Sequence, residues 1–174
     1  MMPEHLHRRA PAFHAMIWGT ALLFLPLAVI GRPHSLPDER AGELLARRVL
    51  DAVNRERRQR GLRPLRWSDL LARAAQAHSQ DMADRQFLGH INPDGYTPAD
   101  RAMLAGARRF RWLAENVGVH WSGPHPAQSV VRGWMASPPH RANILNPRFR
   151  YTGVGVSISA TGAVYVTEVF ADRL

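Results

Sequence analysis

Two histidines and one glutamate, His90, Glu115 and His140, are the residues of this sequence best suited to chemistry. Two imidazoles and a carboxylate can bind a divalent metal, transfer protons or line a polar pocket. The three residues stand on separate segments, so their spacing alone does not choose among these roles. The sequence has no H-E-x-x-H, G-x-S-x-G, glycine-rich phosphate loop or C-x-x-C motif that would favour one reaction.

Glu115 stands out among the acids because of its neighbours. In the segment LAENVGVH it alternates with Leu113, Val117 and Val119, so a strand would place all four side chains on one face. A carboxylate there costs free energy unless it is paired, protonated or facing a polar cavity. A structural carboxylate that accepts backbone hydrogen bonds is the alternative. Glu168 shares the apolar side of a later run and could point inward, and an edge position or a local ion pair fits that pattern equally well.

The segment SPPHRANIL carries His140 in a stiff part of the chain. Pro138 and Pro139 fix their own φ angles and restrict the residues before them. We therefore expect the prolines to end the preceding helix and to set His140, in a rigid loop, toward a cleft shared with the other two candidates. Asn143 is expected to hold the local turn through its amide, and Arg141 to anchor the loop.

Helices in the first half of the chain must position these residues. Apolar spacing predicts a basic amphipathic helix over residues 38–60 with a solvated outer face. Ser68 can cap a second, alanine-rich helix, which indicates close packing against another element. On that helix His78 is expected to be a core histidine rather than a ligand. Thr97 followed by Pro98 predicts the start of a third helix.

The pattern of the second half of the chain predicts mostly strands. Residues 113–119 alternate as a strand, Pro126 can begin a helix, and the runs 151–159 and 163–170 form a predicted hairpin around a Thr-Gly turn. Helices first and antiparallel strands late predict an α+β layered domain.

Composition fits one globular domain. The 174 residues are 45% hydrophobic and 21% charged, which is ordinary for a folded chain of this length. Cysteine is absent, and this excludes disulfides, a thiolate nucleophile and thiolate metal ligands.

The N-terminus has the pattern of a secretory signal. A segment with Arg8 and Arg9 precedes an apolar run over residues 17–30, which is shorter than the roughly 20 apolar residues of a membrane span. We expect residues 1–31 to be a signal peptide or an N-terminal membrane anchor, residues 32–37 a linker, and residues 38–174 the folded domain. The protein is then exported, either periplasmic or extracellular, or tethered to the membrane.

The net charge of +9 comes from arginine alone, since the chain has no lysine. Removing residues 1–31 still leaves +8, so the basic character belongs to the domain. Such a balance favours anionic neighbours such as an envelope surface. Arg101, Arg108, Arg109 and Arg111 could contact phosphate, but the aromatic residues show no RNA-binding signature, and we expect no nucleic-acid partner.

Six segments stand in order along the chain: NRERRQRGLRPLRW, LARAAQAHSQDMADR, FLGHINPDGYTPADR, AENVG, VVRGWMASPPHRANIL and YTGVGVS. Together they resemble the bacterial, cysteine-free branch of the CAP superfamily of cysteine-rich secretory, antigen five and pathogenesis-related proteins, whose domain is also called the SCP domain. The resemblance covers about residues 44–170. It implies a three-layer α-β-α sandwich with a small, mainly antiparallel sheet, and an exported protein.

The resemblance also implies a cleft lined by His90, Glu115 and His140, with Asn116 and Ser137 beside them. Ser137 stands where many eukaryotic relatives have a second acid, and Glu168 stands where the last strand often has glutamine. A divalent metal such as zinc is the cofactor that such a cleft would hold, with His90, His140 and Glu115 as its ligands.

We therefore predict an exported CAP-domain protein whose cleft binds a ligand or a divalent cation at the cell envelope. One alternative is a metal-assisted or serine-type hydrolase of peptide, ester or cell-wall substrates, in which His90, Glu115 and His140 would be catalytic. Another is the binding of a lipid or sterol. The partner is thus a small molecule, a lipid or a cell-wall component, and the sequence leaves open whether catalysis occurs.

Overall fold

The computed structural model describes residues 36–121 and 123–174, which belong to one compact unit. The predicted signal peptide or anchor, residues 1–31, lies outside the described residues, as does the first part of the predicted linker. None of the described helices combines the length and apolar character that a membrane crossing requires.

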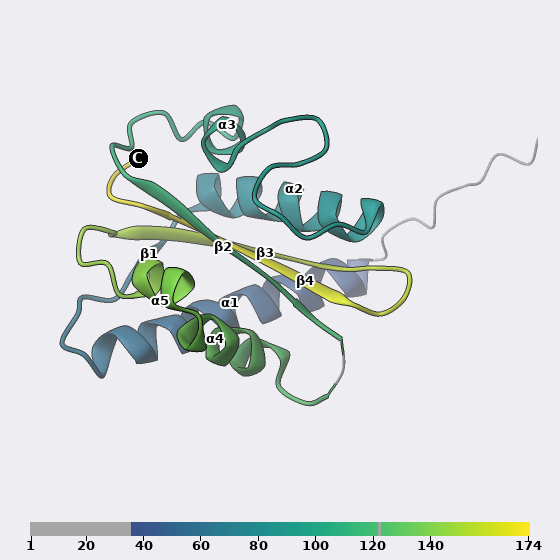
Figure 1. Cartoon of the computed structure of the whole chain (residues 1–174), viewed down its shortest axis with the longest axis horizontal. Helices are drawn as coiled ribbons and strands as arrows, with labels where there is room; N and C mark the ends of the chain where they lie inside the picture. The colour runs from purple at the N-terminus through teal and green to yellow at the C-terminus, as the bar shows by residue number, and fades with distance from the viewer. Residues whose placement is uncertain (1–35, 122) are drawn as a thin grey trace, which may run out of the picture. The chain divides into compact units, whose positions relative to one another are not determined.

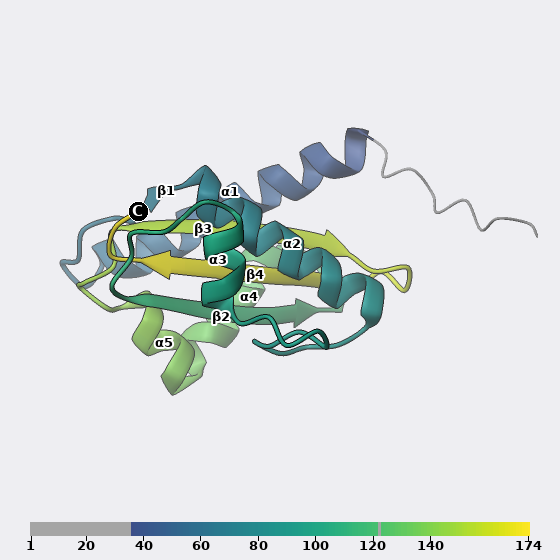
Figure 2. The ribbon, with the colours of Figure 1, turned by 90° about the horizontal axis from the view of Figure 1, so that it is seen from above.

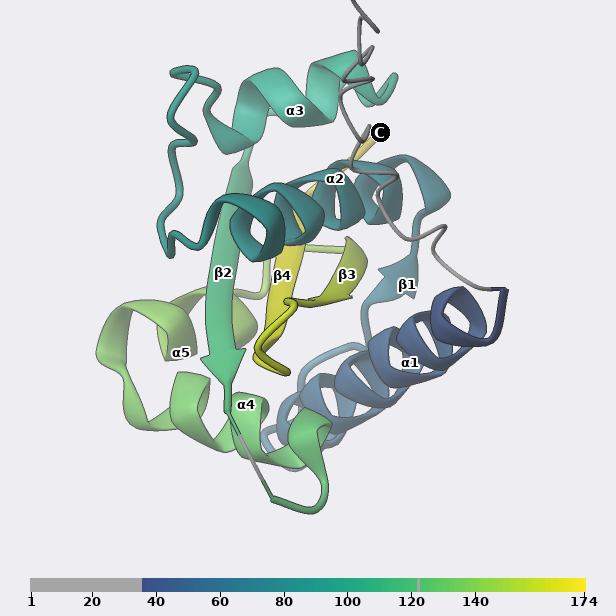
Figure 3. The same cartoon turned by 90° about the vertical axis from the view of Figure 1, so that its right-hand side faces the viewer.

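The domain consists of helices on both faces of one sheet. Helices α2 and α3 cover one face, and α1, α4 and α5 cover the other, as Figure 3 shows end-on. The predicted α+β fold with three layers is confirmed. In chain order the elements are α1 (Leu36–Arg58), β1 (Arg66–Trp67), α2 (Asp69–Arg85), α3 (Pro98–Leu104), β2 (Leu113–His120), α4 (Pro126–Ala136), α5 (Pro138–Ile144), β3 (Tyr151–Ile158) and β4 (Val164–Ala171).

The sheet has the strand order β1-β3-β4-β2 and is mainly antiparallel (Figure 1). β3 and β4 form the predicted hairpin, β4 pairs antiparallel with β2, and the two-residue β1 pairs parallel with β3. The short strand β1 was not predicted, because two residues are too few to show alternation. β2 is an edge strand of the sheet (Figure 2), and it carries Glu115.

The predicted helix starts are confirmed by their caps. Ser68 Oγ accepts a hydrogen bond from Leu71 N at 3.3 Å at the start of α2. At α3, Thr97 and Asp100 bond each other's backbone nitrogens reciprocally, and Pro98 occupies the first turn. These caps fix where α2 and α3 begin relative to the loop that carries His90.

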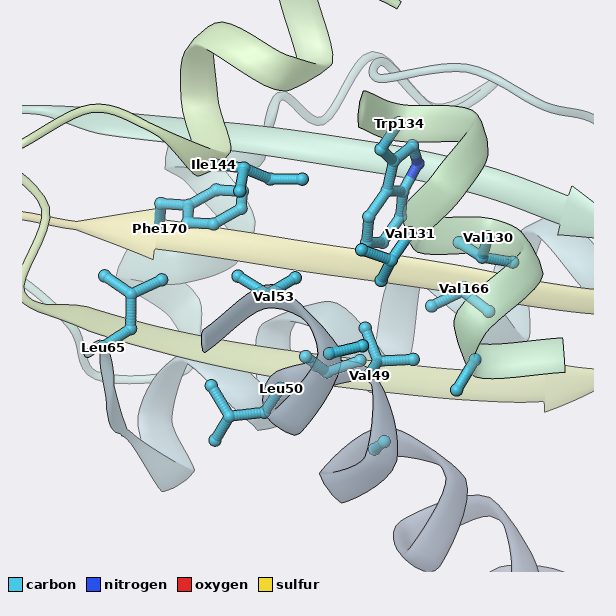
Figure 4. Close-up of a cluster of buried hydrophobic side chains, with 14 of the residues drawn as sticks. Val49, Leu50, Val53, Leu65, Val130, Val131, Trp134, Ile144, Val166 and Phe170 are labelled. Atoms are coloured by element: carbon cyan, nitrogen blue, oxygen red, sulfur yellow. The ribbon is translucent and has the colours of Figure 1, made fainter. Parts of the chain in front are cut away.

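The larger core lies between the sheet and helices α1 and α4. Val49 and Val53 of α1 meet Trp134 of α4 and Phe170 of β4 in the cluster drawn in Figure 4. Trp134 also donates its indole N–H to Val117 O at 2.9 Å, on the free edge of β2. The core therefore protects part of an edge strand that would otherwise expose its backbone.

On the other face, α2 packs directly against the backbone of β3. A Cβ atom on Gly153 would lie 2.0 Å from Ala72 N, and one on Gly155 would lie 2.2 Å from Gln76 N. Only glycine fits at such an approach. The close packing predicted from the alanines of α2 is confirmed.

Arg57 departs from the solvated face predicted for the first helix. It is 1% exposed, and burial lowers its pKa although the charge of Glu168 raises it. Its guanidinium donates to Arg63 O at 2.9 Å, to Ile144 O at 2.6 Å and to Asn146 O at 3.0 Å. The helical pattern did not distinguish this arginine from its exposed neighbours, because its partners are backbone carbonyls far along the chain.

Candidate functional site

Glu115 projects from β2 toward helices α2 and α3, on the same side as Leu113, Val117 and Val119 as predicted. Its side chain is 1% exposed. The buried carboxylate is fully paired: Oε2 accepts from Arg101 Nη2 at 2.8 Å, and Oε1 lies 3.0 Å from His90 Nδ1. The desolvation cost of the acid is therefore offset by a cation and an imidazole.

Arg101 organises this side of the site and was not predicted as part of it. The side chain is buried in α3, and its guanidinium donates to Tyr96 O at 2.8 Å and His90 O at 3.0 Å besides Glu115. It therefore does not belong to a surface patch with its arginine neighbours. Two features of the sequence pointed to this pair: a buried acid requires a partner, and the short helix that follows the His90 loop contains an arginine.

The loop between α2 and α3 presents His90 to solvent. Asn92 Oδ1 accepts from the backbone nitrogens of Asp94 and Tyr96, and Asn92 Nδ2 donates to Asp81 on α2 at 2.9 Å. This side-chain turn holds the loop to α2. The His90 side chain is 49% exposed, and a carboxylate beside Nδ1 favours a proton on that nitrogen.

His78 lies behind the site. It is fully buried, its Nε2 lies 2.7 Å from Gly89 O, and the same nitrogen lies 3.9 Å from Glu115 Oε1. Burial lowers its pKa, although Glu115 raises it, so the imidazole is neutral near pH 7. It is a core histidine as predicted, and it anchors the start of the His90 loop.

SPPHRANIL forms a helix and not the rigid loop that was expected. Ser137 ends α4, and Pro138 and Pro139 open α5, whose first turn tolerates proline because its N–H groups lack intrahelical partners. Ser137 makes no side-chain bond to the helix backbone. Its Oγ lies 2.9 Å from His140 Nδ1 instead, so the serine orients the imidazole.

The rings of His140 and His90 have centroids 6.5 Å apart, tilted by 43°. Partial burial lowers the pKa of His140, and the charge of His90 lowers it further. His140 is thus neutral near pH 7. Its Nδ1 lies against Ser137, and its Nε2 has no hydrogen-bond partner among the described residues.

Asn116 and Asn143 join α5 to the edge of β2. Asn116 Nδ2 donates to His140 O at 3.1 Å, and Asn143 Nδ2 donates to Asn116 Oδ1 at 2.9 Å and to Glu115 O at 3.3 Å. Asn143 therefore holds the neighbouring strand and not its own turn, which corrects the prediction. Asn116 is fully buried on the face opposite Glu115, so it positions His140 from behind.

An open cleft of about 510 Å³ runs beside this cluster. His90, Glu115 and Asn143 line it, and Arg111 contributes a charge. The rest of its lining is mainly apolar: Thr97, Pro98, Ala99, Phe110, Leu113 and Ala114. His140 and Ser137 stand next to this cleft through His90 and are not part of its lining.

Glu115 is a poor candidate for a direct metal ligand, because Arg101 and His90 already occupy its oxygens. In the part of the chain that the structure describes, no three His, Cys, Asp or Glu side chains group closely enough to hold a metal. The contact of Glu115 with His90 Nδ1 is that of a carboxylate that orients an imidazole from behind.

Glu168 is remote from this cluster. It pairs in register with Asn116, so it shares that residue's face, opposite Glu115. It is fully buried, and Thr152 Oγ1 donates to its Oε1 at 3.0 Å. The inward orientation is confirmed, and the acid does not reach the cleft.

Comparison with known proteins agrees with this architecture. The profile of the cysteine-rich secretory protein family, CAP, matches residues 50–170. Uncharacterized protein YkwD of Bacillus subtilis is 37% identical over 109 residues, covering 63% of this chain and 41% of YkwD. Uncharacterized membrane protein YlbC of the same organism is 30% identical over 146 residues, covering 82% of this chain and 39% of YlbC.

A solved structure has the same fold. An extracellular protein containing an SCP domain from Bacillus anthracis superposes with a TM-score of 0.70 at 26% identity, covering 81% of this chain and 45% of that one. The chain spans less than half the length of these three relatives. With the family profile matched over residues 50–170 and the three-layer fold in place, the chain belongs to the cysteine-rich secretory protein family, in its cysteine-free bacterial form.

Proposed function

We propose that this domain is an exported binding module that takes a divalent cation or a small ligand at His90 and His140. The contact of 3.0 Å between Glu115 Oε1 and His90 Nδ1 is the observation that carries the proposal. A carboxylate behind one imidazole nitrogen fixes the ring and its tautomer and leaves the other nitrogen to bind, as in metal-binding histidines generally.

In this proposal Glu115 orients His90 and does not itself bind. Arg101 holds the carboxylate in place, and Ser137 orients His140 as Glu115 orients His90. The apolar lining of the adjacent cleft suits a ligand with an apolar portion, so lipid binding stays within the proposal.

Export rests on the N-terminal pattern of a basic segment before a short apolar run. The Bacillus anthracis relative described as extracellular supports it. We place the domain at the cell envelope, either released or tethered by its N-terminus.

Zinc titration by calorimetry tests the proposal. Wild-type protein should bind Zn²⁺, and His90→Ala and His140→Ala should each abolish the heat of binding. Glu115→Gln should retain binding with about 10–100-fold lower affinity, as expected for a residue behind a ligand. His125→Asn, at an exposed left-handed position away from the site, is the matched control and should bind like wild type.

Two results would contradict this assignment. Equal heats in wild type and both alanine variants would exclude the histidine site, and a complete loss in Glu115→Gln with a native melting curve would make Glu115 a ligand. If wild type does not bind zinc, the proposal is restricted to a small ligand. A screen for ligands whose binding depends on His90 and His140 then tests it.

A serine-type hydrolase is the second candidate, favoured by the 2.9 Å contact between Ser137 Oγ and His140 Nδ1. It ranks lower because prolines occupy the first two positions of α5, where backbone N–H groups would otherwise stabilise an oxyanion. If wild type hydrolysed peptide or ester substrates and Ser137→Ala abolished this turnover, the hydrolase would become the preferred function.

A further inference from the structure

Arginines are concentrated at one end of the domain, where β2 and β3 begin and β4 ends, on the left in Figure 1 and Figure 2. Four segments meet there, namely residues 62–66, 106–112, 146–150 and 172–174. They contain eight arginines, all exposed, and a single acid, Asp172. We call this surface the arginine end.

Contacts between the segments make the arginine end one continuous surface. Arg66 N donates to Arg150 O at 2.8 Å, and Arg150 N donates to Ala171 O at 3.0 Å. The backbone nitrogens of Arg111 and Trp112 both donate to Asp172 Oδ1 at 2.9 Å. The arginines are therefore held near one another by the sheet and its loops.

Little negative charge offsets these arginines. Among the described residues, the one ion pair that involves them joins Arg173 to Asp172 at 3.9 Å, and Asp172 already accepts two backbone hydrogen bonds. Asp81, Asp84 and Asp94 lie on the last turns of α2 and the loop after it, toward the other end of the domain. Charge is thus distributed unevenly along the domain.

We propose that the arginine end docks a linear phosphate-bearing polymer of the cell envelope. Guanidinium groups match phosphate oxygens with paired hydrogen bonds, and a polymer adds the release of its condensed counterions. Eight exposed cations on a surface with one acid are the complement of such a chain.

A polymer suits this surface better than a bilayer does. The exposed Trp112 lies under the guanidinium of Arg148, which is 5.0 Å from its ring centroid, so the indole is not free to enter lipid. α1 has 23 residues, about 35 Å of helix, and it begins at the end of the domain opposite the arginines.

The experiment measures binding of the full chain to inorganic polyphosphate over a range of salt concentrations. One variant carries Arg108→Gln, Arg109→Gln and Arg148→Gln. The control carries Arg40→Gln, Arg48→Gln and Arg132→Gln, exposed arginines of α1 and α4 that give the same change in net charge. Both sets leave the cleft residues intact.

Wild type should bind with an affinity that falls steeply with salt. The arginine-end variant should bind at least about tenfold more weakly with a shallower salt dependence, and the control should change little. His90→Ala and His140→Ala should bind polyphosphate like wild type, so the outcome is independent of the cleft.

Three results would overturn the assignment. Equal losses in the two arginine variants would mean that net charge acts without a defined surface. No binding of polyphosphate by wild type at low salt would exclude a phosphate polymer as the partner. Binding that depends on the arginine end but occurs only with phosphatidylglycerol vesicles, or is tighter with single-stranded DNA, would assign the surface to those partners instead.

Discussion

Two buried carboxylates of this domain, Glu115 and Glu168, have different surroundings. Glu115 has Arg101 and His90 within hydrogen-bonding distance. Glu168 has the hydroxyl of Thr152 on one oxygen, and its Oε2 is buried without a partner among the described residues. Burial raises the pKa of Glu168 from 4.5 to about 8, because the Thr152 hydroxyl and the charge of Arg57 lower it by less. Glu168 is therefore mostly protonated near pH 7.

Glu168→Gln should remove a pH dependence of stability. Between pH 4.5 and 8 the folded chain binds a proton that the unfolded chain has released, so wild type loses stability as pH rises through this window, by up to about 1.4 kcal/mol per pH unit. Glutamine imitates the protonated acid, so the variant should match wild type near pH 4.5 and exceed it increasingly toward pH 8. Urea unfolding at several pH values measures the difference.

Glu43→Gln, which changes an exposed acid of α1, is the control for this comparison. Its stability relative to wild type should stay nearly constant across the same window. A constant difference for Glu168→Gln as well would mean that Glu168 is ionised in the folded protein.

Sequence patterns identified some of the residues of the site, and their limits have a physical cause. The alternation of apolar residues in β2 identified Glu115 as an inward-facing acid, because residues two apart in a strand lie on the same face. Arg101 and Asn143 were missed or misassigned because their partners are a side chain and a carbonyl of β2, at separations of 14 and 28 residues. No local pattern records such contacts.

At the scale of elements, the packing of α2 on β3 determines how closely one helical layer approaches the sheet. Gly153 and Gly155 leave room for the backbone of α2, with positions for added Cβ atoms only 2.0 Å and 2.2 Å from it. The polar contacts follow from this approach: Ser79 donates to Gly155 O at 3.0 Å, and Gln76 accepts from Val156 N at 2.9 Å.

Gly155→Ala should therefore destabilise the domain, by about 1–3 kcal/mol, because the clash is with helix backbone that cannot rotate away. Gly133→Ala is the matched control. Its added methyl group meets no atom within 4 Å, and alanine in a helix stabilises by about 0.5–1 kcal/mol. Thermal unfolding of both variants tests this, and a neutral Gly155→Ala would mean that α2 can shift on the sheet.

The elements that sequence did not predict share a feature: tertiary contacts define them. β1 exists through its pairing with Tyr151 and Thr152. α5 begins on two prolines, a pattern that also ends a helix, and its position is set by the contacts of Asn143 and Asn116 with β2. The longer helices and the hairpin contain enough apolar repeats to be predicted from local sequence, and the predictions of these elements were confirmed.

At the scale of the whole molecule, Arg57 links α1 to the segment between α5 and β3, almost ninety residues later in the chain. It binds the carbonyls of Ile144 and Asn146, at separations of 87 and 89 residues, and of Arg63 near its own helix. These carbonyls lie where α5 ends and the chain turns toward β3. Arg57 thus fixes the end of the helix that carries His140, without touching the cleft.

Arg57→Lys should destabilise the whole domain by about 3 kcal/mol or more. Lysine keeps the charge but cannot reach carbonyls on both sides of the connection, so buried acceptors lose charged hydrogen-bond donors worth about 1.5–3 kcal/mol each. Arg55→Lys, at an exposed position two residues earlier, should change stability by less than about 0.5 kcal/mol. Urea midpoints measure both, and the zinc titration should show weaker binding in Arg57→Lys if the end of α5 becomes mobile. Equal midpoints for the two lysine variants would show that the connection is held by its apolar contacts, with Ile144 and Phe149, and not by Arg57.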